Sequence, residues 1–144
     1  MKDLLAKAIA ISSTKHMGQF DKGGIPYILH PLKVMHYLKS DDMELMAIAV
    51  LHDVVEDTDT TFEDLKNEGM TDRIIAALRL LTKVRGQTYR EYVEGIKTNK
   101  DAILVKLADL RHNSDIRRLK GITEKDVVRM KKYNELYLEL KELI

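Results

Sequence analysis

The sequence predicts an all-α fold. Apolar residues recur at helical spacing in almost every segment, and no stretch shows the sustained alternation of a half-buried strand. Glycines, prolines and capping residues separate these segments. With 144 residues, 44% of them hydrophobic, the chain can bury a sizeable core without disulfides or a structural metal. We therefore expect one domain over residues 1–144, with about seven or eight helices.

The first two helices flank a loop. Residues 2–17 carry apolar side chains at helical spacing, namely Leu4, Leu5, Ala8, Ile9 and Ile11. The loop at 18–26 contains three glycines and a proline. Pro31 suits the first turn of a helix over 31–39, because the N–H that proline lacks has no intrahelical partner there.

The third helix, over 42–56, should be the most buried. Asp41 or Asp42 can act as its N-cap, and the stretch from Leu45 to Leu51 is apolar on all sides. A helix without a polar face is expected at the centre of a domain.

The remaining helices are marked by their caps. Thr60 and Glu63 have the spacing of a capping box and predict a short helix that ends near Gly69. Thr71 precedes a helix over 72–83, and Gly86 breaks the chain before a helix over 88–98. The last two helices cover 100–115 and, after Thr123 and Asp126, 124–143.

Composition excludes several classes of function. With no cysteine there is no disulfide framework, cysteine zinc site or thiol nucleophile, which fits a cytoplasmic protein. No apolar stretch reaches the length of a membrane helix. The net charge of +1 predicts no bulk attraction to DNA, RNA or membranes.

Charge is nevertheless segregated along the chain. Residues 41–68 hold ten acidic side chains and one lysine, whereas residues 111–132 hold eight basic and three acidic side chains. The first segment could hold a cation and the second could hold phosphates. Two solvated helical faces would give the same pattern.

Four polar residues close the apolar third helix. His52 and Asp53 end a stretch that should be buried, and Glu56 and Asp57 follow each of them by four residues, on the same helical face. Three carboxylates this close repel one another unless a cation lies among them. The alternative is a helix that ends at Val55, followed by an acidic loop.

Two further sites add polar groups to apolar surroundings. Asp109 lies near the apolar face of the 100–115 helix and shares a face with Asn113. His30 stands between apolar residues at a helix start. Singly, each has an ordinary structural explanation. Together, His30, His52, Asp53 and Asp109 supply two imidazoles and two carboxylates, the mixed donor set that suits Mn²⁺, Fe²⁺ or Zn²⁺.

The order of these residues resembles that of the HD-domain phosphohydrolases. Closer similarity is to the hydrolase domain of the RelA/SpoT-type enzymes and to the stand-alone small alarmone hydrolases. The resemblance spans residues 18–113 in four blocks: Gly18-Gln19 with Lys22-x-Gly24-x-Pro26-Tyr27, Tyr27-Ile28-Leu29-His30-Pro31-Leu32, Leu51-His52-Asp53-Val54-Val55-Glu56-Asp57-Thr58, and Lys106-Leu107-Ala108-Asp109 with His112-Asn113. It implies a compact HD-domain helical bundle that uses Mn²⁺ to remove pyrophosphate from the 3′ position of (p)ppGpp, a small nucleotide.

The resemblance also implies roles for ten residues. The metal ligands would be His30, His52, Asp53 and Asp109. Glu56 and Asp57 would handle the attacking water and the leaving group. The substrate-binding positions would be Lys22, Asn113 and, by looser similarity, Arg129 and Tyr133. No synthetase or regulatory domain is expected in this chain.

The chain departs from the family pattern at two places. Asp21 stands where the family has an arginine that commonly packs on the guanine base, and Arg111 is displaced by one position from the family's arginine. Such a displacement turns a side chain by about 100° around a helix. An HD-type nucleotidase or phosphatase acting on another nucleotide therefore remains an alternative. A nucleotide-binding sensor without turnover and a purely structural helical protein are the other two.

Overall fold

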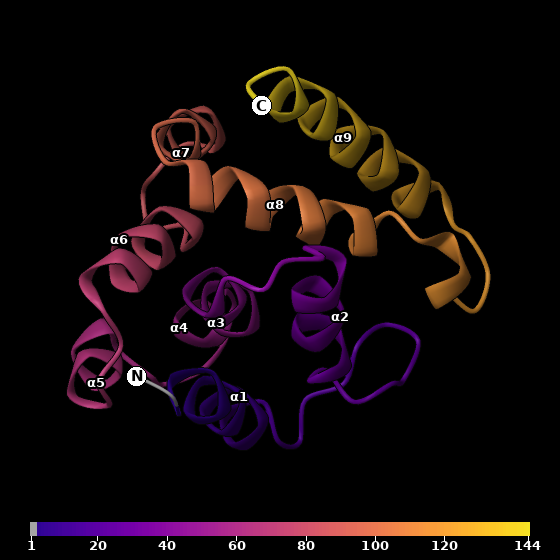
Figure 1. Cartoon of the computed structure of the whole chain (residues 1–144). Coiled ribbons are helices and arrows are strands. Elements are labelled where there is room, and N and C mark those ends of the chain that lie inside the picture. The colour runs from indigo at the N-terminus through magenta and orange to yellow at the C-terminus, as the bar shows by residue number, and fades with distance from the viewer. Residues whose placement is uncertain (1–2) are drawn as a thin grey trace.

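The computed structural model describes residues 3–144, and the fold over these residues is all-helical (Figure 1), as the sequence predicts. The helices are α1 (Leu4–Lys15), α2 (Leu29–Tyr37), α3 (Met43–Leu51), α4 (Val54–Asp57), α5 (Phe62–Asn67), α6 (Asp72–Leu81), α7 (Tyr89–Ile96), α8 (Lys100–Asn113), the short 3-10 helix η1 (Ile116–Arg118) and α9 (Glu124–Lys141). The start expected for the first helix, at residue 2, lies outside the described residues. Among those described, no helix has the length and apolarity needed to span a membrane.

Helices α3 and α8 form the centre of the molecule. As predicted for an apolar helix, α3 is buried over nearly its whole length, and it packs against α1, α2, α6 and α8. Helix α8 crosses the middle of the view in Figure 1 and contacts α2, α3, α6, α7 and α9. Its inner side buries Leu107, Ala108 and Leu110 and, between them, Asp109. A carboxylate so placed needs partners.

The long helix expected over 42–56 is two helices. Helix α3 ends at Leu51, Asp53 has φ −104° and ψ −3°, and α4 begins at Val54. In a continuous helix, neighbouring side chains would point about 100° apart. The break instead lets His52 and Asp53 approach each other, with His52 Nε2 and Asp53 Oδ2 3.0 Å apart.

The predicted helix caps are found with one exception. Thr71 caps α6, and Thr123 with Asp126 forms the capping box of α9. The capping box expected at Thr60 and Glu63 is wrong by one residue, since Thr61 and Asp64 form it. Thr60 is buried, and its hydroxyl accepts a hydrogen bond from Thr58 Oγ1 instead.

The loop between α1 and α2 folds back on itself. Residues Phe20 and Pro26 form an isolated antiparallel bridge, and Asp21 Oδ1 accepts hydrogen bonds from the backbone N–H groups of Gly23 and Ile25. The loop leads directly into α2, whose second residue is His30. It therefore fixes one wall of the site described next.

Candidate metal centre and the adjoining cavity

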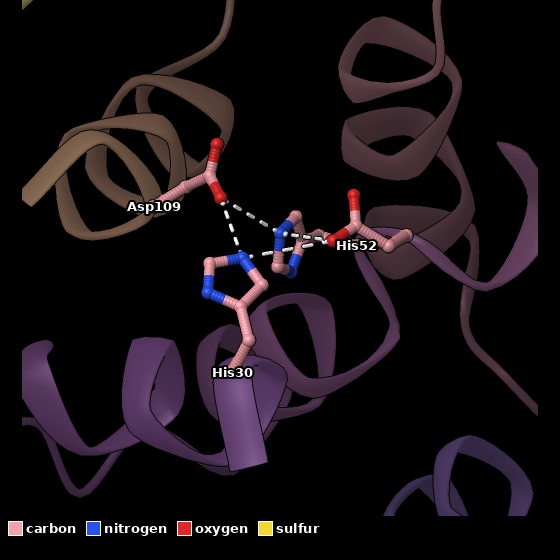
Figure 2. Close-up of side chains that lie close together, drawn as sticks. His30, His52 and Asp109 are labelled. Atoms are coloured by element: carbon pink, nitrogen blue, oxygen red, sulfur yellow. Dashed lines mark hydrogen bonds and ion pairs between the residues drawn. The ribbon is translucent and has the colours of Figure 1, made fainter. Parts of the chain in front are cut away.

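Four side chains from three separate parts of the chain meet in the interior. His30 comes from α2, His52 and Asp53 from the break after α3, and Asp109 from α8; one donor atom from each lies within 4.8 Å of the others. Asp109 Oδ1 is 2.9 Å from His30 Nε2 and 3.1 Å from His52 Nε2. Figure 2 shows His30, His52 and Asp109 pointing toward one another.

Outer contacts of the two imidazoles orient them. His52 Nδ1 lies 2.6 Å from the carbonyl oxygen of Ala49. Because a carbonyl only accepts, Nδ1 carries a proton, and His52 Nε2 is the ring nitrogen that faces the cluster and is available to a metal. His30 Nδ1 lies 2.7 Å from His112 Nδ1. Burial and the nearby Arg118 cation lower the pKa of His112 to about 4, so the His112 ring is neutral at pH 7 and can accept that bond.

The two carboxylates also have partners outside the cluster. Asp109 accepts from Lys106 Nζ and Asn113 Nδ2, both at 3.1 Å, and Asp53 accepts from the Tyr27 hydroxyl at 2.5 Å. Burial by itself raises the pKa of Asp109, but the Lys106 cation and the two imidazoles outweigh burial and hold that pKa well below its usual range. Asp109 is therefore a buried anion at neutral pH.

The donor set fits a divalent first-row metal ion. Two imidazole nitrogens and two carboxylate oxygens converge on one point, and partners outside the cluster hold each ligand in place. Outer contacts of this kind fix ligand orientation in metal sites. The carboxylates also supply the negative charge that such a buried cation requires.

Glu56 and Asp57 lie on α4, one turn beyond the cluster. Glu56 is exposed, and its Oε1 accepts a hydrogen bond of 2.8 Å from the backbone N–H of Lys83. Asp57 is also exposed as a residue, but desolvation of its carboxyl group and the negative charges of Asp53 and Glu56 raise its pKa to about 6. The sequence-predicted pair is thus beside the cluster and makes no hydrogen bond or ion pair with its four side chains.

A cavity of about 290 Å³ adjoins the cluster. The four residues expected to bind substrate, Lys22, Asn113, Arg129 and Tyr133, all line it. Its wall also includes Asp21, Tyr27 and Arg118. Tyr27 and Asn113 contact both the cavity and the cluster, through Asp53 and Asp109. The cavity therefore opens beside the four candidate ligands, at a size near the lower end for small-molecule sites.

The four predicted substrate residues differ in their surroundings. Lys22 is exposed, whereas Arg129 makes an ion pair with Asp126. Tyr133 is partly buried against the core and also reaches the cavity. The Asn113 side-chain amide is engaged at both ends, because Nδ2 donates to Asp109 and Oδ1 accepts from Arg118.

Three residues of the site were missed from the sequence. Tyr27 and His112 stand within the quoted motif blocks, but nothing in their spacing indicates contact with Asp53 or His30. Arg118 lies in the basic segment at 111–132 and is one of its eight cations. The signal that distinguishes Arg118 is spatial, since it pairs with Asp21 from 97 residues earlier.

Comparisons with known proteins give a consistent result, although no family model matches the chain. The chain is 34% identical over 119 residues to a guanosine-3′,5′-bis(diphosphate) 3′-pyrophosphohydrolase of Aquifex aeolicus, and 31% over 121 residues to the bifunctional (p)ppGpp synthase/hydrolase SpoT of Escherichia coli. It is 31% identical over 144 residues to a GTP pyrophosphokinase of Myxococcus xanthus. The first two matches each cover 76% of this chain and 17% of the relative, and the third covers 89% of this chain and 19% of the relative. The chain thus spans less than a fifth of the length of these relatives.

A solved structure matches over nearly its whole length. It is described as that of a metazoan ortholog of SpoT that hydrolyzes ppGpp and plays a role in starvation responses. The TM-score is 0.78 at 25% identity, over 97% of this chain and 93% of the other. The fold and these similarities, together with the four converging side chains, make this chain an HD-domain protein. Within that class it belongs with the RelA/SpoT-type hydrolase domains, as the resemblance of its motifs implies.

Proposed function

We propose that this protein is a metal-dependent 3′-pyrophosphohydrolase of (p)ppGpp, which releases GDP or GTP and pyrophosphate. The observation that carries the proposal is the convergence of His30, His52, Asp53 and Asp109 beside a cavity whose wall includes three basic side chains, Lys22, Arg118 and Arg129. The names of the relatives and of the structural neighbour supply the substrate class.

In this proposal the four converging residues hold one divalent ion, with Mn²⁺ first among the candidates. When bound, such an ion acidifies water and neutralises phosphate oxygens. Mn²⁺ is favoured because two of the four ligands are hard carboxylates and because the family resemblance implies it.

Proton transfer falls to the acidic pair. A water molecule adds to the phosphorus next to the 3′ oxygen, the bond between that phosphorus and O3′ breaks, and a proton must reach O3′. A carboxylate takes the proton of the water, and the same pair returns one to the leaving oxygen. Asp57, with a pKa of about 6, can hold or release a proton near neutral pH. Glu56, one residue earlier, raises that pKa by its charge.

Phosphate groups would be bound on the basic side of the cavity. Lys22 is exposed at the cavity wall and can reach a phosphate as a point charge. Arg129, on α9, also lines the cavity, and its pairing with Asp126 fixes the direction of its guanidinium. Tyr133 provides an aromatic wall. Because Asn113 is already bonded at both ends, we assign it to positioning Asp109 and Arg118 as well as to the cavity wall.

A second candidate is an HD-type nucleotidase acting on another nucleotide. The observation that favours it is Asp21, which stands where the family resemblance expects an arginine on the guanine base. The same metal centre would then release inorganic phosphate. A nucleotide-binding protein without turnover would release neither product.

The test is a product assay with purified protein, Mn²⁺ and ppGpp, followed by chromatography. We expect GDP and pyrophosphate in equal amounts. Release of inorganic phosphate would favour the nucleotidase, and bound nucleotide without product would favour the sensor. For variants in which an acidic residue of the site is replaced, Asp59→Ala is the matched control. Asp59 is an exposed residue of the same acidic segment, and its carboxylate contacts Lys15.

A further inference from the structure

Arg118 occupies a position that the family resemblance does not assign. It lies in η1, lines the cavity, and is only 21% exposed in its side chain. Its guanidinium is held from three directions. Nη1 donates to the carbonyl oxygen of His112 and to Asn113 Oδ1, both at 3.2 Å, and Nη2 donates to Asp21 Oδ2 at 3.3 Å.

The loop that carries Asp21 is fitted against the same 3-10 helix. A Cβ atom added at Gly23 would lie 2.4 Å from the backbone carbonyl oxygen of Arg118, closer than atoms can approach. Asp21 Oδ1 is engaged by the loop's own N–H groups, which leaves Oδ2 for Arg118. The negative charge that replaces the family's arginine thus has a defined partner in this chain.

The geometry of these bonds decides what Arg118 can do. The hydrogen bonds of a guanidinium lie in its plane, so acceptors along the edge fix the plane and do not use its flat faces, through which a guanidinium stacks. Three of the Arg118 N–H groups already donate to protein acceptors, which leaves fewer of them for a phosphate than a free guanidinium would offer. The cavity around it contains apolar and aromatic side chains, namely Phe20, Leu119, Met130 and Tyr133. Apolar and aromatic side chains beside a guanidinium whose plane is fixed suit a nucleobase.

We propose that Arg118 is the base-stacking residue of this site, with Asp21 as the positioning residue that holds its plane. In this chain the cation that contacts the base comes from η1 and not from the loop before α2. The hydrogen bonds from Asp21 through Arg118 and Asn113 to Asp109 connect this base site to the metal cluster. The inference rests on the proposed function only for the substrate class, a guanosine nucleotide.

The experiment measures binding of GDP and of inorganic pyrophosphate, which lacks a base, to the Mn²⁺-treated protein by calorimetry. Arg118→Lys keeps the charge and removes the stacking plane. We expect Arg118→Lys and Arg118→Ala each to weaken GDP binding by about tenfold and to leave pyrophosphate binding within twofold of the parent. Arg117→Ala is the control, because the Arg117 side chain is 87% exposed and pairs with Asp115.

Asp21→Asn tests the positioning role separately. Asparagine retains an oxygen for the N–H groups of Gly23 and Ile25 but cannot pair with Arg118 as an anion. We expect it to weaken GDP binding by about threefold with pyrophosphate binding and melting temperature unchanged, a modest loss since Asn113 and the His112 carbonyl still hold the plane.

Four results would overturn the proposal: wild-type GDP affinity in Arg118→Lys, equal loss of GDP and pyrophosphate binding in Arg118→Ala, unchanged GDP binding in Asp21→Asn, or no GDP binding by the parent protein. The outcome is distinct from that of the product assay. A protein that hydrolyses ppGpp and is indifferent to Arg118 keeps the proposed function and loses this inference. A protein that binds GDP through Arg118 without hydrolysing ppGpp keeps this inference and loses the proposed function.

Discussion

At the scale of single residues, the site depends on contacts made by side chains other than the four candidate ligands. The Ala49 carbonyl keeps a proton on His52 Nδ1, and Tyr27 and Asn113 hold the two carboxylates. Such contacts determine whether a cluster of polar residues can bind a metal or is merely a set of ion pairs. The four candidate ligands are therefore held in their orientations by the protein itself.

Removing one ligand tests this arrangement. We expect Asp53→Ala to abolish Mn²⁺ binding and ppGpp hydrolysis, because Asp53 Oδ2 lies at the convergence point within reach of both imidazoles. Metal content after dialysis and the product assay measure the two effects. Asp59→Ala, at an exposed residue, is the control. Full metal content in Asp53→Ala would show that the cluster is not the metal site.

Glu56 should behave differently from a ligand. We expect Glu56→Ala to retain bound Mn²⁺ and to lower kcat by about 10²–10⁴-fold, the usual range for loss of a general acid or base. Metal is retained because Glu56 contacts Lys83 and not the cluster. The rate falls because Glu56 belongs to the acidic pair to which proton transfer is assigned. Loss of metal from this variant would make Glu56 a ligand and contradict the assignment.

At this scale the sequence could predict which residues form the candidate metal site. His30, His52, Asp53 and Asp109 are all polar residues within or at the end of apolar segments. It could not reveal the pairing of Asp21 with Arg118, because no local pattern links residues 97 positions apart. The same holds for Tyr27 and Asp53, which are 26 positions apart.

At the scale of elements, the helices were predictable and the break at His52 was not. Apolar spacing identifies α3 as the central helix, but two polar residues after Leu51 could have continued it. The contacts of Asp53 with His30 on α2 and of His52 with Asp109 on α8 stabilise the break more than continued helical hydrogen bonding would stabilise a longer α3. The capping box at Thr61 shows the same limit, because Thr60 and Thr61 are equally good caps in sequence and burial of Thr60 decides between them.

Helix α9 packs on α8, and ion pairs also link it to α7 and to Lys97, which follows α7. Glu139 accepts from Arg90 and Lys97, and these two cations lower the pKa of Glu139 to about 2. A carboxylate with a depressed folded-state pKa stabilises the fold above its unfolded pKa, near 4.5, and this contribution is lost as the pH falls toward 2.

We therefore expect Glu139→Gln to lower the free energy of unfolding by about 0.5–1 kcal/mol at pH 7, a small value because these side chains are partly exposed. The difference from the parent protein should shrink as the pH is lowered from 5 to 2. Denaturant unfolding at several pH values measures it, with Glu135→Gln on the same helix as control. A difference independent of pH would contradict the ion-pair explanation.

At the scale of the whole molecule, the fold brings ligands from α2, from the α3–α4 break and from α8 to one point and places η1 and α9 around the cavity beside it. Metal binding should therefore stabilise the entire domain. At Mn²⁺ concentrations 100 times the Kd, we expect stabilisation by about 2.7 kcal/mol, or roughly 5–10 °C in Tm.

Differential scanning calorimetry of the parent protein and Asp53→Ala, with Mn²⁺ and with a chelator, measures this shift. The shift should vanish in Asp53→Ala and persist in Asp59→Ala. An equal shift in Asp53→Ala would place the ion elsewhere in the molecule.

The most direct test of the central claim is ppGpp hydrolysis before chelation, after chelation and after Mn²⁺ is restored, in the parent protein and in Asp53→Ala. We expect GDP and pyrophosphate from the parent protein, none after chelation, recovery with Mn²⁺, and no product from Asp53→Ala under any condition. Continued release of pyrophosphate by the chelated protein or by Asp53→Ala would contradict a hydrolase built on these four residues.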